Sequence, residues 1–188
     1  MKGQKQQIQN LLNSTKESLK TKQQELIDCE EAQIVIQKVA QLTQEELKIH
    51  ISNLVTLALE SVFDEPYEFE VDFVQRRGQS EADLWFVIDG ERIDPLSASG
   101  GGVVDVAAFG LRVSLWSLQK PRSRSIIVLD EPFKYLSSNY QQKAGELLKV
   151  ISEKLKLQIL MISHIEPLVE AADNVIKISQ KKGVSYVL

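Results

Sequence analysis

Two adjacent carboxylates, Asp130 and Glu131, directly follow the short apolar strand expected at residues 125–129. Such a strand is typical of a parallel sheet covered on both faces, and its carboxyl end opens at an edge of the sheet. Paired carboxylates at that edge suit Mg²⁺-nucleotide chemistry: Asp130 would hold the metal's hydration shell while Glu131 polarises an attacking water. The alternative is a strand that merely stops at acidic turn residues.

A second chemical signal is the run Ser99, Gly100, Gly101 and Gly102, which stands immediately before a helical pattern. Glycines let the backbone approach an anion closely, and the start of a helix directs unpaired N–H groups toward it. The run therefore indicates a phosphate-binding loop. An ordinary flexible loop is the alternative, because glycine triplets are common in such loops.

The third signal is His164, which follows a second apolar strand expected at residues 158–163. Its imidazole could donate a hydrogen bond to a terminal phosphate, or it could be a satisfied structural histidine. The order strand, helix, strand favours a right-handed parallel crossover. Asp130, Glu131 and His164 are then predicted to lie at the same carboxyl edge of neighbouring strands.

The elements that position these residues begin with a long helix over residues 1–42, which contain no proline and glycine only at position 3. Leu12, Leu19 and Leu26 recur at heptad spacing, but the seam is thin because Thr15 and Lys22 are polar. The pattern favours the end of a coiled-coil arm that requires a partner helix. A solvated or frayed helix is the alternative.

The remainder, residues 43–188, is expected to be one α/β domain. Thr43 and Glu46 form a capping-box pattern that predicts the start of a second helix. The other expected elements are a β-hairpin at 67–74 and 82–89, a helix behind the glycines to residue 118, a helix from 138 to 155, a short helix at 166–172 and a closing hairpin at 174–179 and 184–188.

Composition limits the function classes. The 188 residues are 43% hydrophobic with a formal net charge of −4, so one core is expected and no global basic surface for nucleic acid. The lone Cys29 cannot form an intrachain disulfide, and His50 and His164 lack zinc-site spacing, which favours a reducing, cytoplasmic setting. The longest apolar runs are too short to span a bilayer, so no membrane partner is expected.

The three motifs together carry a family resemblance. DPLSASGGGVVD looks like an ABC signature motif, SIIVLDEP like a Walker B strand, and LMISHIEPLVEAADNVIKI like a switch-histidine segment, in that order. With the preceding helix, the chain resembles the C-terminal head segment of SMC-like and SbcC-like ATPases of DNA double-strand-break repair, including phage and bacterial relatives. The resemblance implies the C-terminal lobe of an ABC-type P-loop ATPase head, a parallel sheet with flanking helices and β-hairpins, attached to a coiled-coil helix.

The resemblance also implies a role for each motif residue. Ser99 and Gly100 to Gly102 would contact the γ-phosphate of an ATP molecule held on the opposite head. Asp130 would support Mg²⁺, Glu131 would activate the water, and His164 would sense the γ-phosphate. Ser137 stands where the family's D-loop usually has aspartate, and Gly102 stands where glutamine or glutamate is frequent, so these side-chain contributions are in doubt.

The sequence nowhere contains GxxxxGK followed by Ser or Thr, the Walker A loop that cradles nucleotide phosphates. The resemblance therefore implies that the chain is inactive alone and needs an N-terminal Walker A half of the same ATPase. Further implied partners are a second head in a homodimer, DNA and a nuclease subunit. Rival interpretations are a nucleotide-binding domain of an ABC transporter and a catalytically silent coiled-coil interaction module.

Overall fold

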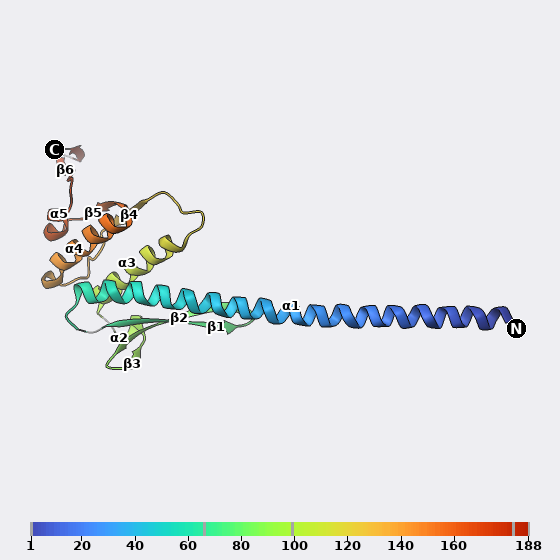
Figure 1. Ribbon diagram of the computed structural model, residues 1–188. Helices are drawn as coiled ribbons and strands as arrows, with labels where there is room; N and C mark the ends of the chain where they lie inside the picture. The colour runs from blue at the N-terminus through green and yellow to red at the C-terminus, as the bar shows by residue number, and fades with distance from the viewer. Residues whose placement is uncertain (1, 66, 99, 182, 188) are drawn as a thin grey trace. The chain divides into compact units, whose positions relative to one another are not determined.

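The computed structural model describes residues 2–65, 67–98, 100–181 and 183–187. The chain forms two compact units, residues 1–46 and residues 47–188. The helices are α1 Lys2–Val62, α2 Pro95–Ala98, α3 Gly101–Leu118, α4 Ser138–Leu155 and α5 Glu166–Glu170, and the strands are β1 Glu68–Arg76, β2 Gln79–Ile88, β3 Glu91–Ile93, β4 Ile126–Asp130, β5 Gln158–Ile162, β6 Ile178–Lys181 and β7 Val184–Val187 (Figure 1).

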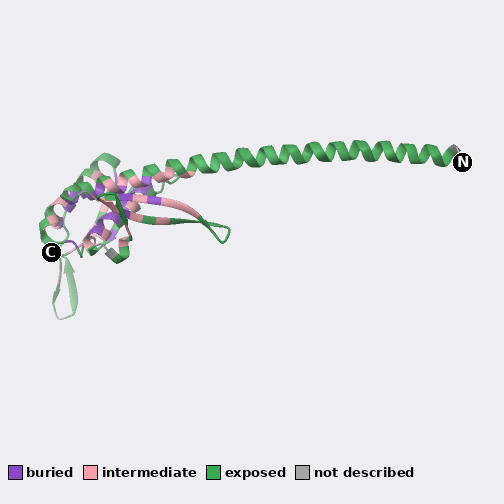
Figure 2. Ribbon diagram, turned by 90° about the horizontal axis from the view of Figure 1, so that it is seen from below, coloured by how far each residue is buried: buried purple, intermediate pink, exposed green. Residues whose placement is uncertain are grey.

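The first unit is one uninterrupted stretch of α1. Residues 3–43 are exposed throughout, and Leu12, Leu19 and Leu26 of the heptad series are 48%, 58% and 59% exposed (Figure 2). The stripe lies on an open helix surface, because nothing in the described residues of this unit packs against it. This agrees with a coiled-coil seam, which buries its leucines only against another helix.

The helix boundary predicted at Thr43 is wrong, because α1 continues without a break to Val62. The Thr43 hydroxyl donates to the carbonyl oxygen of Val39 at 2.9 Å, one turn back, instead of capping free amides ahead of it. A threonine that bonds to the preceding turn is compatible with a helix interior. The capping pattern therefore occurs within the helix.

In the second unit, the last four turns of α1 form the centre of the core with the β1–β2 hairpin and α3. Val55, Leu59 and Val62 of α1 are fully buried, as is Phe86 of β2. A Cβ at Gly110 of α3 would meet Val55 Cα at 3.2 Å, so this glycine permits a close approach of the two helices. Val55, Leu59 and Val62 recur at helical spacing, so this part of α1 has one apolar face and that face is buried.

The predicted hairpin is confirmed as two antiparallel strands, β1 and β2, which extend further than expected and turn at Arg77 and Gly78. Asp89 and Gly90 make the next turn, with φ angles of 52° and 81°, and lead into β3. Two successive positive φ angles are the signature of the tight hairpin turn that Asp-Gly favours. The segment after this turn, expected to be irregular, contains β3 and the short helix α2.

The predicted crossover is also confirmed: β4 and β5 are parallel neighbours, and Asp130 lies opposite Ile162 in their register. One face of the pair is in the core, with Ile127 and Leu129 buried. The expectation that both faces are covered is not met, because the other face carries four exposed apolar side chains among the described residues. These are Ile126 at 40%, Val128 at 59%, Leu160 at 53% and Ile162 at 59% exposure.

After β5 the chain forms α5 and the β6–β7 hairpin; α5 and β7 are close to prediction, whereas β6 begins four residues later than the strand expected at 174–179. The turn of that hairpin includes Gly183, whereas Lys182, part of the same predicted turn, lies outside the described residues. Within the described chain, α3 alone is long and apolar enough to span a bilayer, but half of its window is buried. We therefore interpret α3 as a core helix, which passes the same test of length and composition.

Candidate functional site

The carboxyl edge of the β4–β5 pair brings together two of the predicted catalytic residues. Glu131 follows β4 and His164 follows β5 by two residues, and Glu131 Oε2 lies 2.9 Å from His164 Nδ1. The backbone N–H of Glu131 also donates to the Ile162 carbonyl oxygen at 2.9 Å, which continues the ladder beyond the end of β4. The Glu131 side chain is 36% exposed and that of His164 is 80% exposed, so both remain accessible to a ligand.

Asp130, the last residue of β4, is exposed at the same edge. The described residues contain no group of three or more His, Cys, Asp or Glu side chains arranged to hold a metal ion. Mg²⁺ in nucleotide sites is usually held by one or two carboxylates together with substrate phosphates rather than by an all-protein cage. Asp130 and Glu131, two accessible carboxylates side by side at this edge, fit that manner of binding.

The glycine loop begins α3 as predicted. Gly100 is the N-cap, with extended φ and ψ of −62° and 147°, and no side chain caps it by a hydrogen bond. Gly101 and Gly102 form the first helical turn, and the Gly100 carbonyl oxygen accepts the Val103 N–H at 3.0 Å. The predicted phosphate-contacting Ser99 lies outside the described residues.

These glycines contact the segment that follows β4. A Cβ at Gly101 would lie 3.0 Å from Tyr135 Cβ, and one at Gly102 would lie 3.1 Å from both Leu136 Cα and the Tyr135 carbonyl oxygen. Gly102 therefore makes a backbone-to-backbone approach that a side chain would prevent. This gives a physical reason for glycine at a position where the resemblance leads one to expect glutamine or glutamate.

Sequence reasoning missed Asp105 of α3. Its Oδ2 accepts the backbone N–H of Tyr135 at 3.2 Å, across 30 positions of the chain. The signal available was an acidic residue within the second turn of an otherwise apolar helix, VVDVAAFGL, but this pattern by itself does not reveal what the carboxylate contacts. Leu136 and Ser137 lead into α4, with Ser137 as its N-cap.

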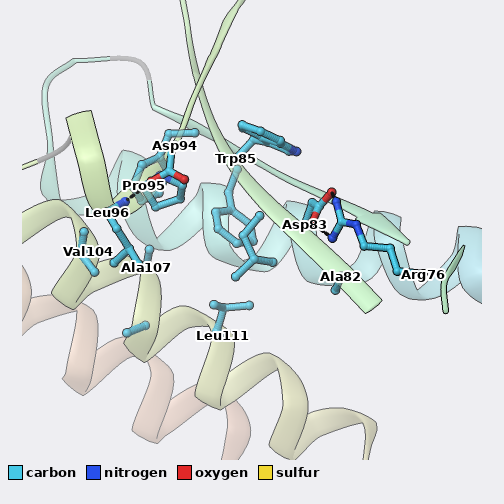
Figure 3. Close-up of a pocket in the computed structure, with 14 residues that line it drawn as sticks. Arg76, Ala82, Asp83, Trp85, Asp94, Pro95, Leu96, Val104, Ala107 and Leu111 are labelled. Atoms are coloured by element: carbon cyan, nitrogen blue, oxygen red, sulfur yellow. Dashed lines mark hydrogen bonds and ion pairs between the residues drawn. The ribbon is translucent and has the colours of Figure 1, made fainter. Parts of the chain in front are cut away.

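Two of the cavities formed by the described residues of the head bear on the site. The smaller, about 200 Å³, is bordered by Asp105, Asp130 and Glu131, so α3 and the carboxylate edge share it. The larger, about 430 Å³, lies between β2 and α3 and includes Leu84, Leu96 and Leu111 (Figure 3). Among the predicted site residues that the structure describes, none lines the larger cavity, whereas Asp130 and Glu131 line the smaller one.

Two adjacent arginines near the tip of the β1–β2 hairpin, Arg76 and Arg77, differ in their surroundings. Arg76 makes a bidentate pair with Asp83, two bonds of 2.7 Å, while Arg77 is in the turn. The hydrogen bonds from Arg76 hold the pKa of Asp83 below its usual value, and the pKa of Arg76 is raised in return. Arg76 is therefore already paired within the hairpin. In the exposed segment before β4, the guanidinium carbon Cζ of Arg122 lies 5.8 Å from the centroid of the Trp116 ring.

No protein-family model matches the chain, but single proteins of similar sequence and similar fold are known. The chain is 31% identical over 110 residues to the DNA double-strand break repair Rad50 ATPase of Thermococcus kodakarensis, covering 58% of this chain and 12% of that protein. It is 30% identical over 156 residues to the protein of the same name in Sulfolobus acidocaldarius, covering 78% of this chain and 17% of that protein.

The fold matches the Smc head domain with a coiled coil and joint from Pyrococcus yayanosii, with a TM-score of 0.67 and 18% sequence identity. That match covers 94% of this chain and 33% of the other. The chain thus spans less than a fifth of the length of these curated relatives, 12% and 17%. The chain is therefore similar in sequence to part of the Rad50 ATPases and has the fold of an SMC-type head with a coiled coil, as expected for the C-terminal half of such a head with the end of its arm.

Proposed function

We propose that the chain supplies half of each composite site in an ATP-hydrolysing machine that acts on DNA breaks. The proposal rests above all on the Glu131–His164 pair, 2.9 Å apart at the carboxyl edge of two parallel strands. In open α/β sheets this edge is where ligands bind. The relatives bear the name of DNA double-strand break repair ATPases, which supports the reaction and the DNA substrate.

In this proposal Glu131 is the general base. Its carboxylate polarises a water for attack on the γ-phosphate, and His164, which shares a hydrogen bond with it, is exposed enough to donate to that phosphate. Asp130 would hold Mg²⁺ through the metal's hydration shell, and the metal would supply neutralisation of the phosphate charge. Each residue thus has a separate task at one edge.

The glycine loop serves the opposite head. Gly100 to Gly102 form the start of α3, where no side-chain cap is present, so the first N–H groups of the helix could bind a phosphate. Ser99, which lies outside the described residues, would contribute its hydroxyl to the same phosphate. The two heads would form a homodimer that closes over two nucleotides and reopens after hydrolysis, moving the arms. DNA and a nuclease subunit are the further partners of this cytoplasmic assembly.

The open face of the β4–β5 pair supports the need for a Walker A half. Val128 and Leu160 are opposite each other in the register, and both are more than half exposed. An apolar sheet face of this kind is normally covered in an α/β domain. A Walker A half of the same ATPase that packs on this face would also bring the phosphate-cradling loop that the sequence lacks.

The transporter alternative is not favoured. Transporter heads are coupled to membrane segments, whereas this chain continues from its head into α1, a helix of 61 residues. The silent interaction module retains no specific support, since both carboxylates and the histidine are together at the edge.

The deciding experiment measures ATP hydrolysis by the chain alone and by the chain reconstituted with the Walker A half-head of its own polypeptide. We expect negligible turnover from the chain alone and turnover of order 0.1–10 per second after reconstitution, at the slow end of typical enzymes. Robust hydrolysis by the chain alone would contradict the proposal. A reconstituted head that binds ATP but never hydrolyses it would point to the silent module.

A further inference from the structure

The chain turns sharply after β4, at the residues that carry the chemistry. Glu131 has a φ angle of 45° and Phe133 one of 60°, both in the left-handed region and neither a glycine. Side chains disfavour this region, so such residues persist only where their surroundings hold them in place. The orientation of the Glu131 carboxylate therefore depends on whatever holds residues 131–137, which we call the post-strand segment.

Helix α3 keeps the post-strand segment in place. The Phe133 side chain is 1% exposed and packs edge-on against Phe109 of α3, with ring centroids 5.6 Å apart. Two positions further along, the Tyr135 N–H donates to Asp105 Oδ2 at 3.2 Å. Next to it, Leu136 lies against the bare backbone of Gly102. Three successive contacts thus fix the post-strand segment along one helix.

Among these contacts Asp105 provides the polar one, and it lies next to the chemistry. The Asp105 side chain is half-buried and borders the same 200 Å³ cavity as Asp130 and Glu131. A carboxylate that accepts a backbone N–H makes a charge-assisted bond, which is stronger and more directional than a contact between apolar groups. Loss of this bond would free the middle of the post-strand segment while leaving the aromatic packing of Phe133 in place.

We propose that Asp105 is a positioning residue that fixes the Glu131 carboxylate by holding the Tyr135 N–H, and that it thereby links the glycine loop to the carboxylate edge of the same chain. Asp105 lies about one helical turn after the glycines. A phosphate bound at the start of α3 would therefore contact the same helix that holds the post-strand segment and, through it, Glu131. The inference rests on the proposed function, because it assigns Asp105 a part in positioning the same hydrolytic site.

The first test compares Asp105→Ala, Asp105→Asn and the control Glu153→Ala in the reconstituted head. Glu153 is an exposed residue of α4 outside the site. We expect Asp105→Ala to lower kcat about tenfold with KM within about twofold, because a misplaced base slows the chemical step without removing ATP contacts. Asp105→Asn, which keeps an oxygen that accepts the Tyr135 N–H, should recover most of the rate.

The urea midpoint of each variant separates positioning from simple destabilisation. A normal kcat in Asp105→Ala would overturn the inference. So would a rate that falls only in proportion to the unfolded fraction, or an Asp105→Asn variant that is as slow as Asp105→Ala.

A second measurement does not require hydrolysis, so failure of the proposed function and failure of this inference can be told apart. Amide hydrogen exchange of the 188-residue chain should be about tenfold faster at Tyr135 in Asp105→Ala, with a smaller increase at Glu131, because one net hydrogen bond is lost. The Leu157 amide, bonded to the Ser152 carbonyl oxygen, should not change. Unchanged exchange at Tyr135 would overturn the inference even if the wild-type head hydrolyses ATP.

Discussion

His164 Nδ1 and Glu131 Oε2 lie 2.9 Å apart although 33 positions separate the two residues in the chain. Parallel pairing of β4 with β5 produces this proximity, because it aligns the carboxyl ends of both strands. An imidazole beside a carboxylate at a ligand-accessible edge can orient the carboxylate toward water and contact a phosphate.

Glu131→Gln should abolish hydrolysis in the reconstituted head and leave ATP binding intact. The amide can still accept a hydrogen bond from His164 Nδ1 but cannot polarise water, so we expect a loss of about 10²- to 10⁴-fold in single-turnover phosphate release. Equilibrium nucleotide binding should stay within about twofold, because the lost interaction is one of the transition state. Glu153→Gln on exposed α4 is the matched control. Wild-type turnover in Glu131→Gln would remove the assigned base and revive the silent module.

Gly102→Ala should destabilise the head by about 1–2 kcal/mol, because the new Cβ would occupy space that backbone atoms fill. The cost of this steric clash should exceed the gain in helix propensity from glycine to alanine. The nearest atoms include Leu136 Cα and the Tyr135 carbonyl oxygen, both at 3.1 Å. Gly100→Ala is the neighbouring control, since a Cβ there meets nothing within 4 Å and only the cap preference is lost. Urea unfolding measures both, and an equal or larger loss in Gly100→Ala would contradict the packing argument.

Leu160→Arg should prevent assembly with the Walker A half and leave the chain itself folded. Leu160 is 53% exposed on the open face of β5, so the chain alone should lose less than about 1 kcal/mol. A charge in the centre of a covered apolar face should weaken association at least about tenfold, measured by titration calorimetry. Leu57→Arg, at a 59% exposed position of α1, is the control. Undiminished association of Leu160→Arg would show that the Walker A half packs elsewhere.

The ion pairs on the hairpin should make stability depend on pH through Asp72. The Lys48 ammonium donates to Asp72 Oδ1 at 2.8 Å, and this bond, with the nearby Arg92, holds the pKa of Asp72 below its usual value. A lowered folded-state pKa gives stability that is complete above the unfolded pKa, about 4, and is lost as the pH falls through the folded value.

Asp72→Asn should therefore reduce stability by about 0.5–1 kcal/mol at pH 7, and the difference from wild type should shrink below about pH 4. The Asp72 side chain is 27% exposed, which keeps the expected effect small. Urea unfolding from pH 3 to pH 7 measures this, with Asp173→Asn on an exposed loop as control. A difference that stays constant down to pH 3 would show that the pair contributes through packing and not through charge.

The sequence by itself determined the types of most of the longer elements and the order of the chemical residues, but not β3, α2 or the continuity of α1. The apolar runs before Asp130 and His164 favoured parallel strands because their short length is typical of buried strands and too small for most helices. The glycines before α3 indicated the helix start, and Asp89-Gly90 indicated a hairpin turn, because these signals depend only on local backbone preference.

Tertiary structure alone decided which residues meet across the chain. The Asp105 bond to Tyr135 and the approach of Gly102 to Leu136 depend on how α3 packs against the post-strand segment, and local periodicity does not record this. The error at Thr43 has a local reason: its hydroxyl donates to the Val39 carbonyl oxygen of the preceding turn, so the capping pattern lies inside a continuous helix. Periodicity shows which face of an element is apolar, whereas only packing determines what that face contacts.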